Sequence, residues 1–298
     1  MSALDLAIIG QLARGRFGVF DAACPQCGPE RRRPIKQKKP VLRIWRIDQR
    51  FASYHCARCG MKGHTRDGSI ARIDPAAIAR AKAEAAERDR ITRAERLSKA
   101  QWLWSRSRSI AGTVAESYLR DARGYAGPLP ATLRFLPSRG DHGAAMLAAF
   151  GMATEPEPGR IDIDAGDVCA VHITRLAPDG SGKAGTERDK IMVGLSAGSP
   201  IVLAPPNDGL GLAITEGIED ALSAHVATGL GAWAAGAASF LPALAPAIPA
   251  YVDCITILAD DDADGRRHAA ELARRLREQR CNVRLIRLAP GVTWSAAA

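Results

Sequence analysis

Residues 256–265 read TILADDDADG, and this stretch decides the fold of the second half of the chain. The short apolar run 255–258, which ends in turn-forming residues, predicts a buried strand. Directly behind it stand four aspartates: Asp260, Asp261, Asp262 and Asp264. A helix is expected to open at Gly265. Carboxylates crowded at a strand end repel one another unless a cation neutralises them. Magnesium prefers oxygen ligands and keeps coordination sites for water and phosphate.

A second carboxylate stands at the end of an earlier expected strand. Residues 210–215 are strand-like and end at Glu216 and a glycine, after which 218–228 have helical spacing. Ligands bind at the carboxyl ends of the strands in an open α/β sheet. Glu216, Asp260 and Asp262 are therefore expected to meet at one edge of the sheet, as catalytic groups and magnesium ligands.

The acidic run has a simpler alternative explanation. It could be a solvated loop that caps the following helix, with Asp264 as the capping residue. The Glu-Gly pair at the end of the earlier strand favours the metal site, because a cap alone does not require a second carboxylate there. Asp261 and Asp264 are not expected among the metal ligands.

The spacing of these motifs resembles that of the Toprim domain, in which one strand closes on Glu-Gly and a later strand closes on Asp-x-Asp-x-x-Gly. Here Asp260, Asp262 and Gly265 form the second motif. The resemblance is to bacterial-type DNA primases, most closely to the primase-like proteins of plasmids and phages. It implies a Rossmann-like parallel sheet and a magnesium-dependent site, with manganese as a substitute, for nucleotidyl transfer or phosphodiester chemistry.

Strand and helix patterns alternate from residue 209 to about 288, which predicts a parallel sheet covered on both faces. The strands are expected near 210–215, 230–235, 254–259 and 282–288. Gly236 follows the second strand, where a glycine would let the backbone approach a phosphate closely. Gly236 and Gly265 are therefore candidate nucleotide-binding positions.

Four of the seven cysteines form two Cys-x-x-Cys pairs, each followed by a glycine. They are Cys24, Cys27, Cys56 and Cys59. Residues 41–47 and 51–55 between them alternate like the strands of a hairpin. Four thiolates hold zinc in a closed tetrahedral site, so the spacing predicts a zinc ribbon, with a redox pair as the alternative. Cys169, Cys254 and Cys281 are expected in the core.

The charge of the chain is unevenly distributed. Residues 1–125 carry 26 Lys and Arg against 12 Asp and Glu, whereas the remainder carries 15 against 20, and the net charge is +9. A basic front half favours a polyanionic partner. The ribbon interleaves cations with aromatic residues: Arg31, Arg32, Arg33, Lys36, Lys38, Lys39, Arg43, Trp45, Arg46 and Phe51. Such a surface suits single-stranded DNA. The alternatives are a solvated basic face and a core role for Trp45.

A helix is predicted from 76 to about 108, and Thr113 with Glu116 forms a capping box for a shorter one. Residues 112–137 again resemble the primase-like family. Further strands are predicted at 168–176 and from Lys190 onward. The resemblance implies that basic residues here contact template or nucleotide: Arg175, Lys183, Arg188 and Lys190, with Lys190 preferred because it begins a strand. The Gly-Lys pair at 182–183 lacks the other P-loop residues, which excludes a P-loop ATPase.

The predicted order is that of a bacterial-type primase without its helicase-binding part. It comprises a zinc ribbon (1–73), a helical linker (74–125), a basic α+β primase-core subdomain (126–207), a Toprim domain (208–290) and a tail (291–298). The resemblance implies a DNA-directed RNA polymerase of primase type. Such an enzyme would bind a single-stranded DNA template and make short RNA primers from nucleoside triphosphates in plasmid, phage or mobile-element replication.

Its helicase would then be a separate protein. A non-catalytic nucleic-acid-binding accessory protein and a Toprim nuclease are the alternatives. No apolar run reaches the eighteen or so residues needed to cross a bilayer, and the N-terminus lacks the pattern of a signal peptide. A cytoplasmic protein without membrane contact is therefore expected.

Overall fold

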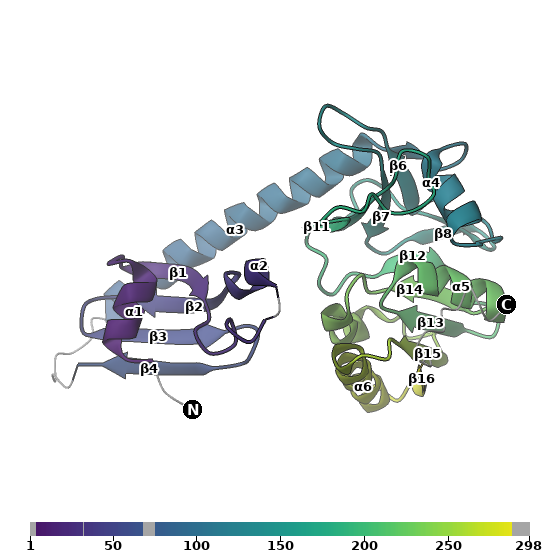
Figure 1. Cartoon of the computed structure of the whole chain (residues 1–298). Helices are drawn as coiled ribbons and strands as arrows, with labels where there is room; N and C mark the ends of the chain where they lie inside the picture. The colour runs from purple at the N-terminus through teal and green to yellow at the C-terminus, as the bar shows by residue number, and fades with distance from the viewer. Residues whose placement is uncertain (1–3, 32, 68–74, 288–298) are drawn as a thin grey trace. The chain divides into compact units, whose positions relative to one another are not determined.

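The computed structural model describes residues 4–31, 33–67 and 75–287 (Figure 1). Arg32 and the predicted tail 291–298 lie outside these ranges. The chain divides into two compact units, Met1–Thr92 and Arg93–Ala298. Within the described ranges, every helix is too short or too polar to span a bilayer. The expected α/β class is confirmed, with a parallel sheet in the C-terminal region and a four-cysteine cluster near the N-terminus.

The first unit is built on a four-stranded antiparallel sheet in the order β1-β2-β3-β4. Its strands are β1 (Gly18–Ala23), β2 (Pro40–Arg46), β3 (Phe51–Cys56) and β4 (Lys62–Arg66). Helix α1 (Leu6–Ala13) packs on this sheet through Ile9, and the short helix α2 (Pro34–Gln37) precedes β2. The predicted hairpin is β2-β3, and its turn is fixed by the Asp48 carboxylate, which accepts the backbone N–H of Arg50 and Phe51.

Helix α3 (Pro75–Ser105) belongs to both units. It was predicted from 76 to about 108, and it ends three residues earlier. Many of its described side chains are exposed, as its Ala, Glu, Lys and Arg content predicts, but Ala100 and Trp104 are buried. Its last turns therefore form part of the core of the second unit.

The second unit begins with a five-stranded sheet in the order β11-β10-β7-β6-β5. Its strands are β5 (Arg108–Ser109), β6 (Leu133–Leu136), β7 (Ala145–Phe150), β10 (Ala170–Arg175) and β11 (Lys190–Gly194). A small hairpin follows β7, formed by β8 (Thr154–Glu157) and β9 (Arg160–Asp162). Alternate residues of β7 divide the core: Leu147 packs toward α3, and Met146 packs toward the C-terminal sheet.

The C-terminal sheet has the order β12-β14-β13-β15-β16. Its strands are β12 (Ile201–Ala204), β13 (Gly211–Thr215), β14 (Gly231–Ala234), β15 (Cys254–Ala259) and β16 (Asn282–Arg287). The four predicted strands are confirmed as a parallel set. Strand β12 adds an antiparallel edge, although it lies in the segment predicted to precede the Toprim domain. The predicted domain boundaries remain predictions.

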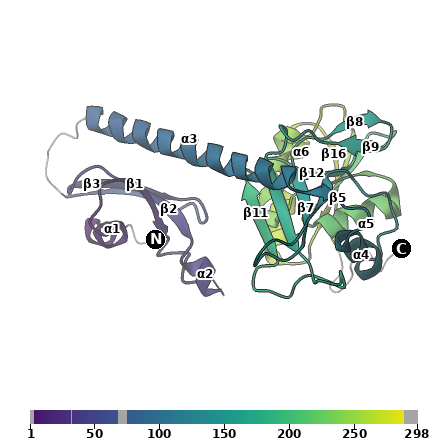
Figure 2. The same ribbon diagram turned by 90° about the horizontal axis from the view of Figure 1, so that it is seen from above.

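Helices cover both faces of this sheet, because successive residues of β13 and β14 are all buried and each strand points its side chains to both faces. Helix α5 (Ile218–Thr228) packs on the face that carries Ala232 and Ala234. The 3-10 segment η2 (Ala238–Ala247) and helix α6 (Ala263–Glu278) pack on the face that carries Trp233. The predicted capping box is formed in part: Thr113 caps α4 (Val114–Ser117), but the Glu116 carboxylate accepts the N–H of Gly112 instead of that of Thr113. Helix α4 lies beside α5 in the view of Figure 2.

Two expectations were wrong. Helix α6 begins at Ala263, and its cap is Asp262 rather than Asp264, because the Asp262 carboxylate accepts the backbone N–H of Gly265 at 2.6 Å. Of the three cysteines expected in the core, Cys281 is half-buried and packs against the core of the C-terminal sheet, whereas Cys254 is exposed and Cys169 is half-buried, because they lie at the start of β15 and directly before β10.

Candidate active site

Two carboxylates leave neighbouring strands at the same edge of the C-terminal sheet. Strands β13 and β15 run parallel and side by side, and Thr215 is paired with Leu258. Glu216 directly follows Thr215, and Asp260 stands two positions beyond Leu258. The sheet register therefore brings together the ends of two strands that are more than forty residues apart in sequence, as the motif spacing predicted.

The electrostatics of this edge are those of crowded negative charge. Burial raises the pKa of Glu216, and the charges of Asp260 and Asp262 raise it further. Burial and the charge of Asp262 likewise raise the pKa of Asp260. We call Glu216, Asp220, Asp260 and Asp262 the carboxylate rim. Each added negative charge destabilises the others, so the rim favours a bound cation.

The rim is not a closed metal cage. Among the described residues, only the four cysteines form a group of ligand atoms that all lie within 4.8 Å of one another. The Asp262 carboxylate is turned to the N–H of Gly265. Magnesium usually keeps several waters and is held by one or two carboxylates plus substrate phosphates. Glu216 and Asp260 fit that requirement, and Asp262 could add its second carboxylate oxygen, because the Gly265 N–H occupies only Oδ1.

Asp220 is a rim residue that the sequence analysis missed. Burial raises its pKa, and so do the charges of Asp260 and Glu219. A side chain at Gly217 would place its Cβ 2.4 Å from Asp220 Oδ2, so the glycine of the Glu-Gly pair makes room for this carboxylate. The available signal is the pair of acidic residues 219 and 220 in the first helical turn after the Glu-Gly pair. The sequence pattern there predicts a helix and does not by itself indicate that these carboxylates lie at the site.

Glu219 is the second missed residue, and it lies at the centre of a polar network. Its carboxylate accepts the Tyr118 hydroxyl at 2.7 Å and pairs with Lys183 at 3.3 Å and Lys190 at 3.8 Å. Burial alone would raise the pKa of Glu219, but the two lysines and the Tyr118 hydrogen bond lower it to about 2. The Arg123 guanidinium donates to the same Tyr118 oxygen at 3.0 Å.

Lys190 is the cation that connects this network to the rim. It begins β11, as predicted, and its charge lowers the pKa of Glu216, Asp220 and Asp260 against the effect of burial. Lys183 stands beside it in the preceding loop. Arg188 is exposed in the turn before β11, and no described carboxylate pairs with it. The structure thus places Lys190, but not Arg188, in contact with the network.

The two candidate glycines have steric roles. Gly236 has φ +78°, and a Cβ there would lie 2.6 Å from the Phe150 ring. Its N–H donates to the Glu216 carbonyl oxygen at 2.9 Å, so this amide is already engaged. A Cβ at Gly265 would lie 2.7 Å from the Asp260 carbonyl oxygen. Gly265 therefore lets α6 start close beside the end of β15.

The two remaining aspartates of the acidic run pair with arginines of α6. Asp261 pairs with Arg266 at 2.7 Å, and Asp264 pairs with Arg267 at 3.0 Å. Each of these two charges therefore already has a partner of opposite sign.

The four cysteines form the second candidate site. Cys24 Sγ lies 3.9 Å from Cys59 Sγ, and Cys27 Sγ lies 3.8 Å from Cys56 Sγ. Four ligands at about 2.3 Å from a tetrahedral zinc ion stand roughly 3.8 Å apart, so the sulfur spacing fits zinc. Gly28 and Gly60 close the two turns, with backbone N–H bonds to the Cys24 and Cys56 carbonyls. The four predicted ligands are thus brought together in a cluster whose geometry fits zinc.

The first unit also carries an aromatic surface beyond its core. Trp45 is half-buried and lines a hollow together with Phe51, Ile47 and Lys82 of α3. His64 stacks beside Phe51, with ring centroids 6.1 Å apart. Arg43 is unsuited to a phosphate contact because it already pairs with two carboxylates, Asp21 and Asp89.

The C-terminal sheet and the carboxylate rim at its edge have the arrangement of a Toprim domain. Residues 211–294 match the family model for the Toprim domain, and residues 94–203 match a domain of unknown function, DUF7146. The chain therefore contains a Toprim domain, and the predicted resemblance is confirmed for that segment. A search of curated proteins found no match.

Among solved structures, the chain is similar to bacterial primase domains at low identity. A DNA primase domain from Pseudomonas aeruginosa matches with 13% identity and TM-score 0.36, over 62% of this chain and 55% of that one. The DnaG primase catalytic domain bound to ssDNA matches with 11% identity and TM-score 0.43, over 70% and 77%. The zinc-binding and RNA polymerase domains of the Aquifex aeolicus primase match with 14% identity and TM-score 0.41, over 94% and 75%. The chain spans about half the length of the first of these.

Proposed function

We propose that this protein is a primase-type nucleotidyltransferase that uses magnesium to join ribonucleotides on a single-stranded DNA template. The observation that carries the proposal is the placement of Glu216 and Asp260 at adjacent strand ends within a Toprim domain. Burial and the neighbouring aspartate charges raise their pKa values, and a bound cation would oppose both effects. Lys190 is the basic side chain that acts on both carboxylates.

Asp260 would hold magnesium, with manganese as a substitute, and Asp262 would add the carboxylate oxygen that its cap does not use. The ion would supply charge neutralisation for a triphosphate and for the phosphorus under attack. Lys190 would bind a phosphate oxygen, held at its place by Glu219. Glu216 would either hold the metal or accept the proton of the attacking 3′ hydroxyl.

The cysteine cluster would hold a structural zinc ion, because four thiolates leave no open coordination position. The hollow beside Trp45 and Phe51 would accept unpaired template bases, which stack on aromatic rings, while nearby lysines bind phosphates. The plasmid or phage setting, the cytoplasmic location and a separate helicase partner are part of the same proposal and derive from the sequence resemblance.

A primer-synthesis assay tests the function. Purified full-length protein is incubated with single-stranded DNA, ribonucleoside triphosphates and magnesium, and the products are resolved by length. Asp260→Ala should reduce product by at least a hundredfold, whereas DNA binding, measured by fluorescence anisotropy, stays unchanged. Asp264→Ala is the matched control, because Asp264 is exposed and pairs only with Arg267.

The alternatives give different results in the same tubes. A Toprim nuclease would shorten the template in a magnesium-dependent way that Asp260→Ala abolishes. An accessory protein would bind DNA without making or shortening any strand, and both variants would behave like the wild type. Either result would overturn the proposed polymerase activity.

A further inference from the structure

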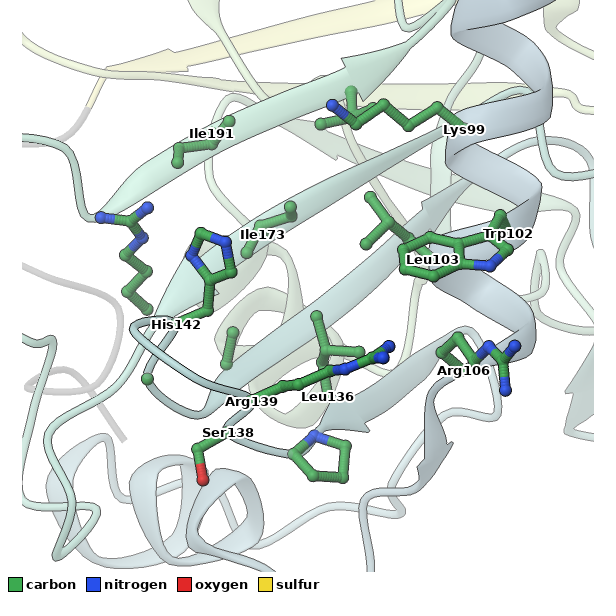
Figure 3. Close-up of a pocket in the computed structure, with 15 residues that line it drawn as sticks. Lys99, Trp102, Leu103, Arg106, Leu136, Ser138, Arg139, His142, Ile173 and Ile191 are labelled. Carbon is green, nitrogen blue, oxygen red and sulfur yellow. The ribbon is translucent and has the colours of Figure 1, made fainter.

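A pocket of about 480 Å³ lies on the face of the β11-β10-β7-β6-β5 sheet that α3 covers (Figure 3). It is separate from the carboxylate rim. Side chains alternate along a strand, so Ile191 of β11 lines the pocket whereas the adjacent Lys190 pairs with Glu219 on the other face. The proposed catalytic site does not use any residue of this pocket.

The pocket has an apolar floor and two basic walls. The floor consists of aliphatic side chains of the sheet, with Leu136, Ile173 and Ile191 between the walls in Figure 3. One wall is the end of α3, with Lys99, Trp102 and Arg106. The other is the loop after β6, with Arg139 and His142. Arg175 at the end of β10 completes the basic lining.

The positive charge of this lining is not compensated within the described part of the chain. No ion pair with a described carboxylate is formed by Lys99, Arg106, Arg139 or Arg175, and none of the described lining residues is acidic. Four cations around a partly desolvated hollow attract an anion more strongly than they would in open solvent. The pocket is therefore complementary to a ligand with several negative charges.

Trp102 supplies the second recognition element. Its side chain is 47% exposed, which is unusual for so large an aromatic residue, and Arg106 lies 5.7 Å from its ring centroid. An exposed indole next to an aliphatic floor provides a surface on which a flat ring can stack. A ligand that is only a polyanion would leave this surface unused.

The loop that carries Arg139 and His142 is preorganised. The two residues face each other across a tight turn, with N–H···O bonds of 2.8 Å and 3.1 Å between their backbones. Residues paired in this way place their side chains on the same side of the ribbon. The binding groups on this wall are thus held together before any ligand arrives, which lowers the entropy cost of binding.

We propose that this pocket binds one free nucleotide, with the base stacked on Trp102 above the aliphatic floor and the phosphates on the cations of the loop wall. The volume lies in the range typical of small-ligand pockets and suits a single nucleotide. The proposal does not depend on the polymerase activity, because its site shares no residue with the rim.

Isothermal titration of the full chain with ATP, in EDTA and without divalent cations, tests the site. Under these conditions the rim carboxylates repel the triphosphate. Trp102→Ala and Arg139→Ala should each weaken ATP binding about tenfold, as expected for loss of one stacked ring or one phosphate contact. Arg160→Ala is the matched control, since Arg160 is an exposed arginine that pairs with Glu157 outside the pocket.

The Asp260→Ala variant distinguishes ATP binding in the pocket from ATP binding at the carboxylate rim. If the pocket binds nucleotide, this variant keeps the wild-type affinity for ATP in EDTA, even where it has lost primer synthesis. Trp102→Phe keeps an aromatic ring and should retain ATP binding, but it should lose the ATP-induced change in tryptophan fluorescence. This variant tests the site even if Trp102→Ala folds poorly. Adenosine, which lacks phosphates, should bind at least tenfold more weakly than ATP.

Three results would overturn the proposal. The first is equal ATP affinity in wild type, Trp102→Ala and Arg139→Ala. The second is loss of ATP binding in Asp260→Ala, which would assign the nucleotide to the rim. The third is binding of a ten-residue oligodeoxynucleotide that depends on Trp102 together with no measurable binding of ATP, which would make the pocket part of a strand-binding surface.

Discussion

The Tyr118 hydroxyl donates a 2.7 Å hydrogen bond to the Glu219 carboxylate, across 101 residues of sequence. Tyr118 follows the capped helix α4, and Glu219 lies in the first turn of α5 in the Toprim domain. The bond therefore joins the segment that matches DUF7146 to the Toprim fold, at the carboxylate that pairs with Lys183 and Lys190.

Removing the Tyr118 hydroxyl should destabilise the second unit. Tyr118 is fully buried, and a hydrogen bond to a charged group contributes about 2 kcal/mol, so Tyr118→Phe should lower the free energy of unfolding by about that amount. Chemical denaturation followed by circular dichroism measures it. Tyr251→Phe is the control, because Tyr251 is 59% exposed, and it should change stability by less than about 0.5 kcal/mol. Equal stabilities for the two variants would contradict a role for this bond.

Substitution of Gly265 should cost stability although it lies in a helix. A glycine to alanine change inside a helix normally gains up to about 1 kcal/mol. Here the new Cβ would lie 2.7 Å from the Asp260 carbonyl oxygen, so the helix start must move. Gly265→Ala should therefore lower stability by about 1–3 kcal/mol. Gly166→Ala is the control, since no atom lies within 4 Å of its added Cβ. A gain in melting temperature for Gly265→Ala would refute the steric argument.

Stability should fall in mild acid because of His172. Burial lowers the pKa of this side chain to about 4, and the charge of Lys190 adds to the effect. Histidine in an unfolded chain titrates near 6.5, so the unfolded state binds the proton first. The stability lost to this effect between pH 7 and pH 5 is about 2 kcal/mol, and from about one pH unit above 6.5 upward His172 contributes almost no slope. Denaturation curves of wild type and His172→Gln at both pH values check this. An identical fall in the variant would rule out His172 as the cause.

Metal binding at the rim should depend on Asp260. Titration of Mn²⁺, followed by electron paramagnetic resonance, should show at least tenfold weaker binding in Asp260→Asn, because a neutral amide removes one of the two central carboxylate charges. Asp261→Asn should bind as the wild type does, since the Asp261 carboxylate is paired with Arg266. Equal Mn²⁺ affinity in the two variants would show that the carboxylate rim does not bind the metal.

The cysteine cluster should hold one zinc ion per chain. Cys56→Ser should lose it, as measured by native mass spectrometry, and the first unit should lose its cooperative melting transition because a structural zinc site contributes directly to folding. Cys254→Ser is the control, because Cys254 is exposed and lies outside the cluster. Full zinc content in Cys56→Ser would show that another residue replaces this ligand.

Local patterns in the sequence determined many of the secondary-structure elements and the cysteine cluster. The Cys-x-x-Cys spacing, the hairpin between the pairs, the Thr113 cap and the alternating strands and helices from residue 209 are each encoded within a short window. Each depends on periodicity or on the preference of one residue for a turn, so it could be predicted without knowledge of the fold. The adjacent placement of the strand ends that precede Glu216 and Asp260 also followed, because parallel strands align their carboxyl ends.

Tertiary structure alone decided which groups surround these residues. The sequence does not show that Glu219 accepts a hydrogen bond from Tyr118, because that contact depends on how distant segments pack. It also does not show that Asp262 caps α6, because Asp262 and Asp264 are both suitable capping residues. The pocket beside Trp102 has the same origin, because its walls come from α3 and from a loop more than thirty residues further along the chain. A hydrogen bond or a cavity between remote segments leaves no periodic signal in the sequence, so only the folded chain reveals it.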